Sequence, residues 1–233
     1  PNGSCAYSSS TEPGASPLSV VQKALAKLYG CYEHLNNGRV GAALEDLTGG
    51  IADSLYLRDG VVSQLDGSQK QQYGVEAGAE IQSGAMFARL SGMLQQGHLV
   101  GATYKLKYQI EGEAPAMACE GGALQKTTQS ETKPAHLVYP VLQCHETPQG
   151  QFVRLRNPYA KMPDGSSAPE WKGAWGNASA DWQNNPEVAQ QLGGRPPRDG
   201  SFWMAFRDFC AGFNKLHVCR LAGAGWQQRR VPG

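Results

Sequence analysis

The feature that most constrains the fold is a pair of short apolar segments joined by a tight connection. In the second segment, residues 152–156 alternate in character, so that Val153 and Leu155 share one face of a half-buried strand. Residues 137–144 (LVYPVLQC) form the other predicted strand, although Pro140 restricts it to a sheet edge or a bulge. The short connection ETPQG between the two strands predicts a β-hairpin.

Asn157 and Pro158 end the second strand, because proline has no N–H group and restricts the residue before it. His136 lies where a long Gly-, Thr- and Ser-rich segment, residues 111–134, gives way to the first strand. The antiparallel hairpin places these two strand ends side by side. An asparagine amide can hold an imidazole in one tautomer, and the imidazole can then act on a thiol. Spacing alone favours the simpler alternative, an asparagine that starts a turn and a histidine exposed on a loop.

Helices and strands are mixed along the rest of the chain. Ser16 and Pro17 have the character of an N-cap and a first helical residue, followed by apolar residues at helical spacing. Helices are predicted over 17–35, 83–96 and 186–192, further strands over 104–110 and 216–221, and a loop of uncertain strand content over 58–80. Antiparallel pairings without regular βαβ alternation predict an α+β fold.

Composition excludes several classes of protein. The 233-residue chain is 40% hydrophobic and 18% charged, as in globular proteins, and its net charge of +1 does not favour nucleic acid or an anionic membrane. It contains neither a signal peptide nor an apolar run near the ~18 residues of a membrane span. Its six cysteines lack CxxC spacing, which argues against zinc. A disulfide framework is the alternative to buried, reduced thiols, which we expect in a cytoplasmic protein.

One stretch carries a family resemblance. RLRNPYAKMPDGSSAPEWKGAWGNASADW resembles the core of the calpain cysteine proteases, where an R-x-RNPWG turn is followed by EW-x-G-x-W-S-D and a further Trp. Three other segments agree in the same order: ALAKLYGCYEHLNNGRVGAALEDLTGGIAD, LVGATYKL and DGSFWMAFRDFCAGFNKLHVCRL. The resemblance covers roughly residues 17–221 and implies a papain-like protease subdomain, with antiparallel sheets flanked by helices.

The resemblance also divides the chain. Residues 1–16 are expected to be a disordered leader, and residues 17–50 the terminal helix of the first protease subdomain with a hinge at Thr48-Gly49-Gly50. Residues 51–222 match the second subdomain, which carries the catalytic His and Asn. Residues 223–233 are a tail.

Two catalytic residues are implied by the resemblance. Asn157 matches the family's catalytic Asn, and His136 is the best match to the histidine of the family's GHAY motif. His145 is the fallback, although it lies at the far end of the strand. The sequence departs from the family pattern at neighbouring positions, where Gly, Trp and Gly are replaced by Ala135, Tyr159 and Ala160.

The calpain nucleophile lies in a separate upstream subdomain, in a Gln-x5-Gly-x-Cys-Trp type segment that this sequence does not contain. We therefore expect the chain to supply His and Asn to a calpain-type endopeptidase core and to be inactive alone. The expected partners are protein substrates and the Cys-bearing subdomain, with no nucleic acid and no direct membrane contact. The alternative is a non-catalytic calpain-like protein that acts as a binding or regulatory module.

The resemblance further implies a calcium ion on this subdomain. Glu170 and Asp199 match two acidic ligand positions, whereas Asn177 and Ser201 replace acids. Because carboxylate count tunes calcium affinity, the sequence predicts a weak or empty calcium site. The alternative is that Glu170 and Asp199 serve as surface charge and helix cap.

Overall fold

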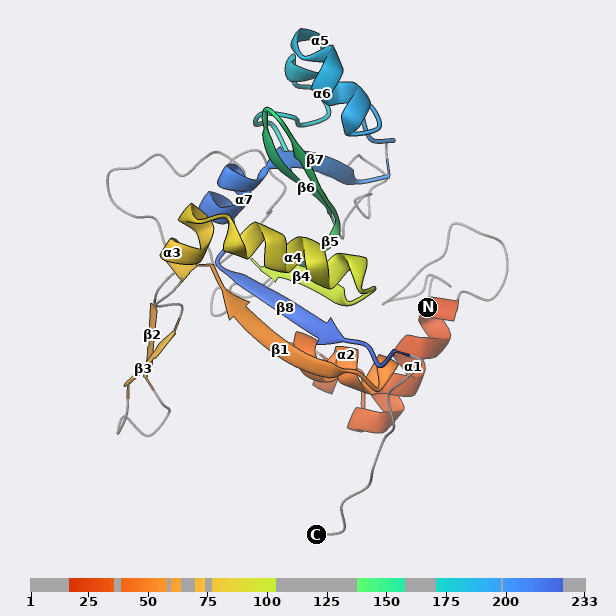
Figure 1. Cartoon of the computed structure of the whole chain (residues 1–233). Helices are drawn as coiled ribbons and strands as arrows, with labels where there is room; N and C mark the ends of the chain where they lie inside the picture. Colours follow the sequence, from red (N-terminus) through yellow and green to blue (C-terminus); the bar gives the residue numbers. More distant parts are fainter. Residues whose placement is uncertain are drawn as a thin grey trace.

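The computed structural model describes residues 17–35, 39–57, 60–63, 70–73, 77–103, 138–157, 171–197 and 199–223. These residues form helices packed on an antiparallel sheet, which confirms the predicted α+β class (Figure 1). The predicted leader, the strand over 104–110 and the segment 111–134 lie outside the described residues.

The main sheet has six strands in the order β1-β8-β4-β5-β6-β7, and each neighbouring pair is antiparallel. In that order the strands are β1 (Ile51–Tyr56), β8 (Lys215–Arg220), β4 (Leu99–Thr103), β5 (Val138–Thr147), β6 (Gly150–Arg156) and β7 (Ser201–Ala205). The pairing of β5 with β6 confirms the predicted hairpin. A separate ribbon of β2 (Gly60–Ser63) and β3 (Lys70–Tyr73) projects from the body of the molecule (Figure 1).

Strand β5 changes partner part-way along its length. Its first residues, Val138 to Pro140, pair with β4, and from Val141 onward the strand pairs with β6. The register shifts between Val141 and Gln143, so the bulge predicted from Pro140 is present. Strands β4 and β5 approach closely at Gly101, where an added Cβ would lie 2.6 Å from Val138 Cγ1. Any larger residue at this position would therefore force the Val138 side chain to move.

Short helices flank the sheet. They are α1 (Pro17–Tyr29), α2 (Val40–Thr48), α3 (Ala77–Gln82), α4 (Ala85–Gln95), α5 (Asp181–Asn184), α6 (Pro186–Gln191) and α7 (Phe206–Gly212), with a 3-10 turn η1 (Glu33–Leu35) after α1. Helix α1 ends earlier than predicted because Gly30 adopts a left-handed φ of 101°. Helix α4 ends before Gly97, as predicted, and Gly97 has a φ of 78°. Among the described residues, no helix is long and apolar enough to cross a membrane.

The main core lies between one face of the sheet and helices α4 and α7. The sheet strands and these two helices contribute many of its side chains, among them Tyr139, Val153, Leu155, Met204, Leu216, Met86, Phe87, Leu90 and Phe209. Phe87 and Phe206 meet edge to face with ring centroids 5.1 Å apart, which joins α4 to α7. This core therefore fixes both helices against the strands that lead to Asn157.

A second core covers the opposite face of β6 and β7. It contains Phe152, Trp175, Trp182, Val188, Leu192 and Trp203. Side chains alternate across a strand, so Phe152 points into this core while Val153 points into the main one. The tryptophans are accordingly structural: the rings of Trp175 and Trp182 meet at 5.1 Å, and Trp182 Nε1 donates to the Gly176 carbonyl at 2.8 Å.

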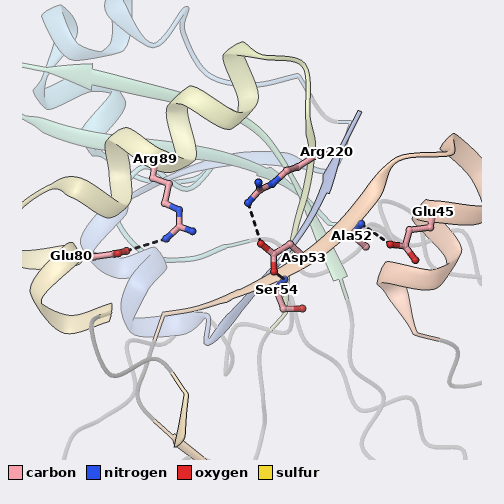
Figure 2. Close-up of polar contacts among 7 residues, drawn as sticks. All are labelled: Glu45, Ala52, Asp53, Ser54, Glu80, Arg89 and Arg220. Atoms are coloured by element: carbon pink, nitrogen blue, oxygen red, sulfur yellow. Dashed lines mark hydrogen bonds and ion pairs between the residues drawn. The ribbon is translucent and has the colours of Figure 1, made fainter. Parts of the chain in front are cut away.

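At the other end of the sheet, exposed polar contacts add to the pairing of β1 with β8, as Figure 2 shows. Arg220 of β8 forms an ion pair with Asp53 at 3.2 Å, and both side chains are largely exposed. The Ala52 N–H donates to Glu45 of α2 at 2.8 Å. Gly50, in the predicted hinge, lies so close to β8 that an added Cβ would be 2.6 Å from Cys219 Sγ and 2.7 Å from the Arg220 carbonyl oxygen.

Candidate active site

Asn157 directly follows β6 and is buried, with 5% of its surface exposed. Its backbone N–H donates to the Gly200 carbonyl at 2.9 Å. The preceding residue, Arg156, donates from Nε to the Asp199 carbonyl at 3.1 Å. The end of β6 is thus fastened by two hydrogen bonds to the segment that leads into β7. This agrees with an asparagine held in a defined place at the end of a strand.

The start of β5 lies at the same end of the hairpin as Asn157. Val141 pairs with Leu155, and two more residues in that antiparallel register bring Tyr139 opposite Asn157. His136 precedes the first residue of β5 by two positions and lies outside the described residues. The hairpin that motivates the His–Asn pair is therefore present, and the contact between the two side chains stays a prediction.

His145 does not serve as the partner of Asn157. It pairs with Phe152 near the turn of the hairpin. Phe152 and Asn157 are five positions apart on β6, which is roughly 17 Å at about 3.4 Å per residue. The structure therefore excludes the fallback histidine, because no side chain spans that distance.

The described cysteines are free thiols, and those in the sheet and in α7 are unsuited to nucleophilic attack. Cys210 and Cys219 are buried. Burial raises the pKa of the Cys144 thiol to about 12, so the thiolate that attacks a carbonyl is scarce at neutral pH. Cys31 is half-buried between α1 and η1, outside the sheet that carries Asn157. Cys5 and Cys119 lie outside the described residues.

Three of the predicted metal-site positions meet at the start of β7. Ser201 is fully buried, and its hydroxyl donates to Asp199 Oδ1 at 2.6 Å. The Asn177 amide donates from Nδ2 to the Ser201 carbonyl at 3.3 Å. Arg154 of β6 donates to Ser201 Oγ at 2.9 Å. Glu170, the fourth predicted position, lies outside the described residues.

The carboxylate of Asp199 is stabilised in its ionised form. The hydrogen bond from the Ser201 hydroxyl is the largest cause of a lowered pKa, and the Ser201 N–H and the Arg154 charge add to it. Partial burial acts in the opposite direction and does not overcome these contacts. Within the described residues, no three His, Cys, Asp or Glu side chains gather as a metal-binding group.

Comparison with known proteins identifies the family. The model of the calpain family of cysteine proteases matches residues 2–220 of this chain. The chain belongs to the calpain family. Its sequence is 28% identical to mouse Calpain-5 over 225 residues, which cover 92% of this chain and 31% of that protein. It is 30% identical to the Arabidopsis thaliana calpain-type cysteine protease DEK1 over 220 residues, covering 94% of this chain and 8% of the relative.

A third relative, the chicken Calpain-1 catalytic subunit, is 28% identical over 205 residues, which cover 87% of this chain and 23% of that subunit. The chain thus spans less than a third of the length of each of these calpains. The match confirms the family resemblance and with it the general class of protease-core fold. Because the coverage is this short, the activity of a complete calpain is not assigned to this chain by the comparison alone.

Sequence reasoning missed one residue of the site. Arg154 was part of the motif that indicated the family, yet its contact with Ser201 was not foreseen. A usable signal was present: Arg154 shares a strand face with Phe152, which is buried, and a charge on a buried face needs polar partners.

Proposed function

We propose that this calpain-family chain supplies the histidine and asparagine of a cysteine endopeptidase core. In this proposal His136 takes the proton of a thiol provided by a Cys-bearing subdomain and later gives it to the leaving amine. Asn157 orients the imidazole and fixes its tautomer. The substrate class is the peptide bond of proteins.

The observation that carries the proposal is the setting of Asn157. An asparagine that only starts a turn has no need of burial, whereas Asn157 is 5% exposed and its backbone is fastened to Gly200. It lies beside the start of the strand that follows His136. An orienting amide requires this kind of fixed placement, because a small displacement of a catalytic group is costly in rate.

A Cys-bearing partner subdomain is supported by the surface of the two N-terminal helices. Val20 and Leu28 of α1 are 62% and 66% exposed, and Leu47 of α2 is 51% exposed. The only side chain that is buried in the described part of α1 is Ala26. Another protein segment could cover these exposed apolar side chains. The cysteine chemistry described above supports an isolated chain without peptidase activity.

The test joins this chain to the Cys-bearing subdomain of a calpain and measures cleavage of casein and of a fluorogenic peptide. We expect turnover that is lost in His136→Ala, since general acid–base catalysis contributes about 10²–10⁴-fold. Asn157→Ala should cause a smaller loss, because only orientation is removed. His145→Ala and Asn184→Ala are matched controls that should keep the parent rate.

Full activity in His136→Ala would overturn the assignment of the base. Thiol-dependent cleavage by the unfused chain, abolished in Cys31→Ala, would overturn the need for a partner. A folded fusion that binds substrate without cleaving it would favour the alternative, a non-catalytic binding module.

The proposed location is the cytoplasm. The four described cysteines are free thiols, as is usual in a reducing compartment. Fluorescence microscopy of the tagged protein tests this, and secretion with glycosylation at Asn2 or Asn177 would contradict it.

A further inference from the structure

The cluster at the start of β7 contains two buried polar atoms of opposite kind without a hydrogen-bond partner among the described residues. One is Arg154 Nε, a donor, and the other is Asn177 Oδ1, an acceptor. Both side chains reach the same residue, since Arg154 donates to Ser201 Oγ at 2.9 Å and Asn177 donates to the Ser201 carbonyl at 3.3 Å. The orientation of the Asn177 amide is fixed by this contact, because a carbonyl accepts only from Nδ2.

The two atoms without a partner, Arg154 Nε and Asn177 Oδ1, indicate which kind of molecule could bind between them. A cation would satisfy Asn177 Oδ1 but would leave the Arg154 Nε donor without an acceptor. An anion would accept from Arg154 Nε but would be repelled by the Asp199 carboxylate and by the Asn177 oxygen. A neutral molecule that both donates and accepts satisfies both atoms, and water has this property.

The Asp199 and Ser201 side-chain oxygens already take part in hydrogen bonds within the cluster. Asp199 Oδ1 accepts from both the Ser201 N–H at 2.9 Å and the Ser201 hydroxyl at 2.6 Å. Ser201 Oγ in turn accepts from Arg154. Calcium needs six to eight oxygen ligands, several of them carboxylates, and the described part of this site supplies one carboxylate. The residues therefore do not fit the calcium ion that the family resemblance implies.

We propose that this cluster holds its surroundings in place without calcium, and that it binds a single water molecule between Arg154 and Asn177. The chain of hydrogen bonds from Arg154 through Ser201 to Asp199 holds the segment 199–201 against β6. Through the Gly200 carbonyl, the same segment holds the backbone of Asn157.

The first test uses the 233-residue chain itself. Its melting temperature is measured by calorimetry in millimolar calcium, in millimolar magnesium and in EDTA, and we expect the same value in all three. Terbium luminescence gives a second readout, because Trp175 and Trp203 lie two positions from Asn177 and Ser201. No sensitised terbium emission is expected. A calcium-specific rise of several degrees, or saturable terbium emission, would overturn the proposal.

The second test restores the acids. The variant Asn177→Asp with Ser201→Glu should bring calcium-specific stabilisation and terbium emission, since it adds two carboxylates to the cluster. Asn184→Asp with Gln183→Glu makes the same change of charge on the exposed surface of α5 and should show neither. If the restored variant folds and binds no calcium, the acids are not what the site lacks, and that part of the proposal fails.

A crystal structure of the unaltered chain, from crystals grown in millimolar calcium, would identify the bound molecule directly. The expected result is a water within hydrogen-bond distance of both Arg154 Nε and Asn177 Oδ1, without anomalous signal. A calcium ion there, or the Glu170 carboxylate in place of the water, would overturn the proposal.

Discussion

The two ends of the main sheet are built differently. At the β6–β7 end, both faces of the strands are covered, one by the main core and the other by the tryptophan-rich second core. At the β1 end, Ile51 is 53% exposed, and the nearby helices α1 and α2 leave apolar side chains in solvent. Figure 1 shows these helices beside the strands β1 and β8, away from α5 and α6.

The contacts that fasten each end differ in the same way. The β6–β7 end holds Asn157 through buried packing and a backbone hydrogen bond to Gly200. The β1 end depends in part on exposed contacts such as Arg220 with Asp53 (Figure 2), and exposed ion pairs contribute about 0.2–1 kcal/mol. The difference indicates that the chain is held more firmly around Asn157 than at the β1 end.

The sharpest way to break this comparison is to remove one large side chain from each end. Trp203 is 1% exposed in the second core, so Trp203→Ala should lower the free energy of unfolding by about 3–5 kcal/mol. Leu28→Ala on α1 should change it by less than about 0.5 kcal/mol, because Leu28 is already in solvent. Urea denaturation followed by circular dichroism measures both. Equal losses would show that α1 is packed as firmly as the second core.

Thiol reactivity sharpens the comparison in a second way. The pKa of Cys144 is raised to about 12 from an ordinary 9.0, so its thiolate should be roughly 10³-fold rarer than that of an ordinary thiol. We expect Ellman's reagent to label Cys31, which lies between α1 and η1, long before Cys144. Mass spectrometry of the labelled peptides identifies the order, and prompt labelling of Cys144 would show that the β5–β6 hairpin opens readily.

A substitution at Gly50, in the predicted hinge, should have a smaller effect. Gly50→Ala places a methyl group 2.6 Å from Cys219 Sγ and should cost about 1–3 kcal/mol of stability. Gly92→Ala in α4 is the matched control, because nothing lies within 4 Å of its added Cβ, and it should stabilise by about 0.4–1 kcal/mol. Adding Cys219→Ala to Gly50→Ala should recover part of the loss. A neutral Gly50→Ala would mean that β1 moves away from β8 without cost.

The smallest expected effect is a shift in acid stability. The pKa of Asp199 is lowered in the fold, so its contribution to stability is present at neutral pH and is lost as the pH falls through that lowered pKa. Asp199→Asn should remove this acid-dependent loss. Ser201→Ala should move it to higher pH, since the hydroxyl is the main cause of the shift. Thermal melts at a series of acidic pH values measure both, and unchanged curves would contradict the assignment.

Local patterns were sufficient for some elements of the fold. Helix α4, the β5–β6 hairpin and the short helix from Pro186 all follow from periodicity and turn residues, and each is confirmed within one to three residues. The segment SFWMAFRDFCAGF is apolar and aromatic throughout, and no local pattern predicts that it divides into β7 and α7. Strand β7 is covered on both faces, so its residues do not alternate and give no strand signal.

Contacts between residues far apart in the sequence are harder to predict from local patterns. The pairing of β1 with β8 joins residues 51–56 to residues 215–220, and no local pattern encodes such a contact. In the site, the Asn-Pro pair at the end of a strand drew attention to Asn157, and the family resemblance supplied its predicted role. The contacts of Arg154 and Ser201 were not found, because they join positions 47 residues apart.

The register of β1 and β8 has a mechanical consequence. Ile51 lies opposite Arg220, so the chain enters β1 and leaves β8 at the same end of the pair. Tension applied between residues 50 and 221 would therefore open the ladder one pair at a time, as a zipper opens, and would not shear all its hydrogen bonds together. Sequential opening needs little force. A pull along the chain would separate β1 from β8 first, while the strands that hold Asn157 stay paired.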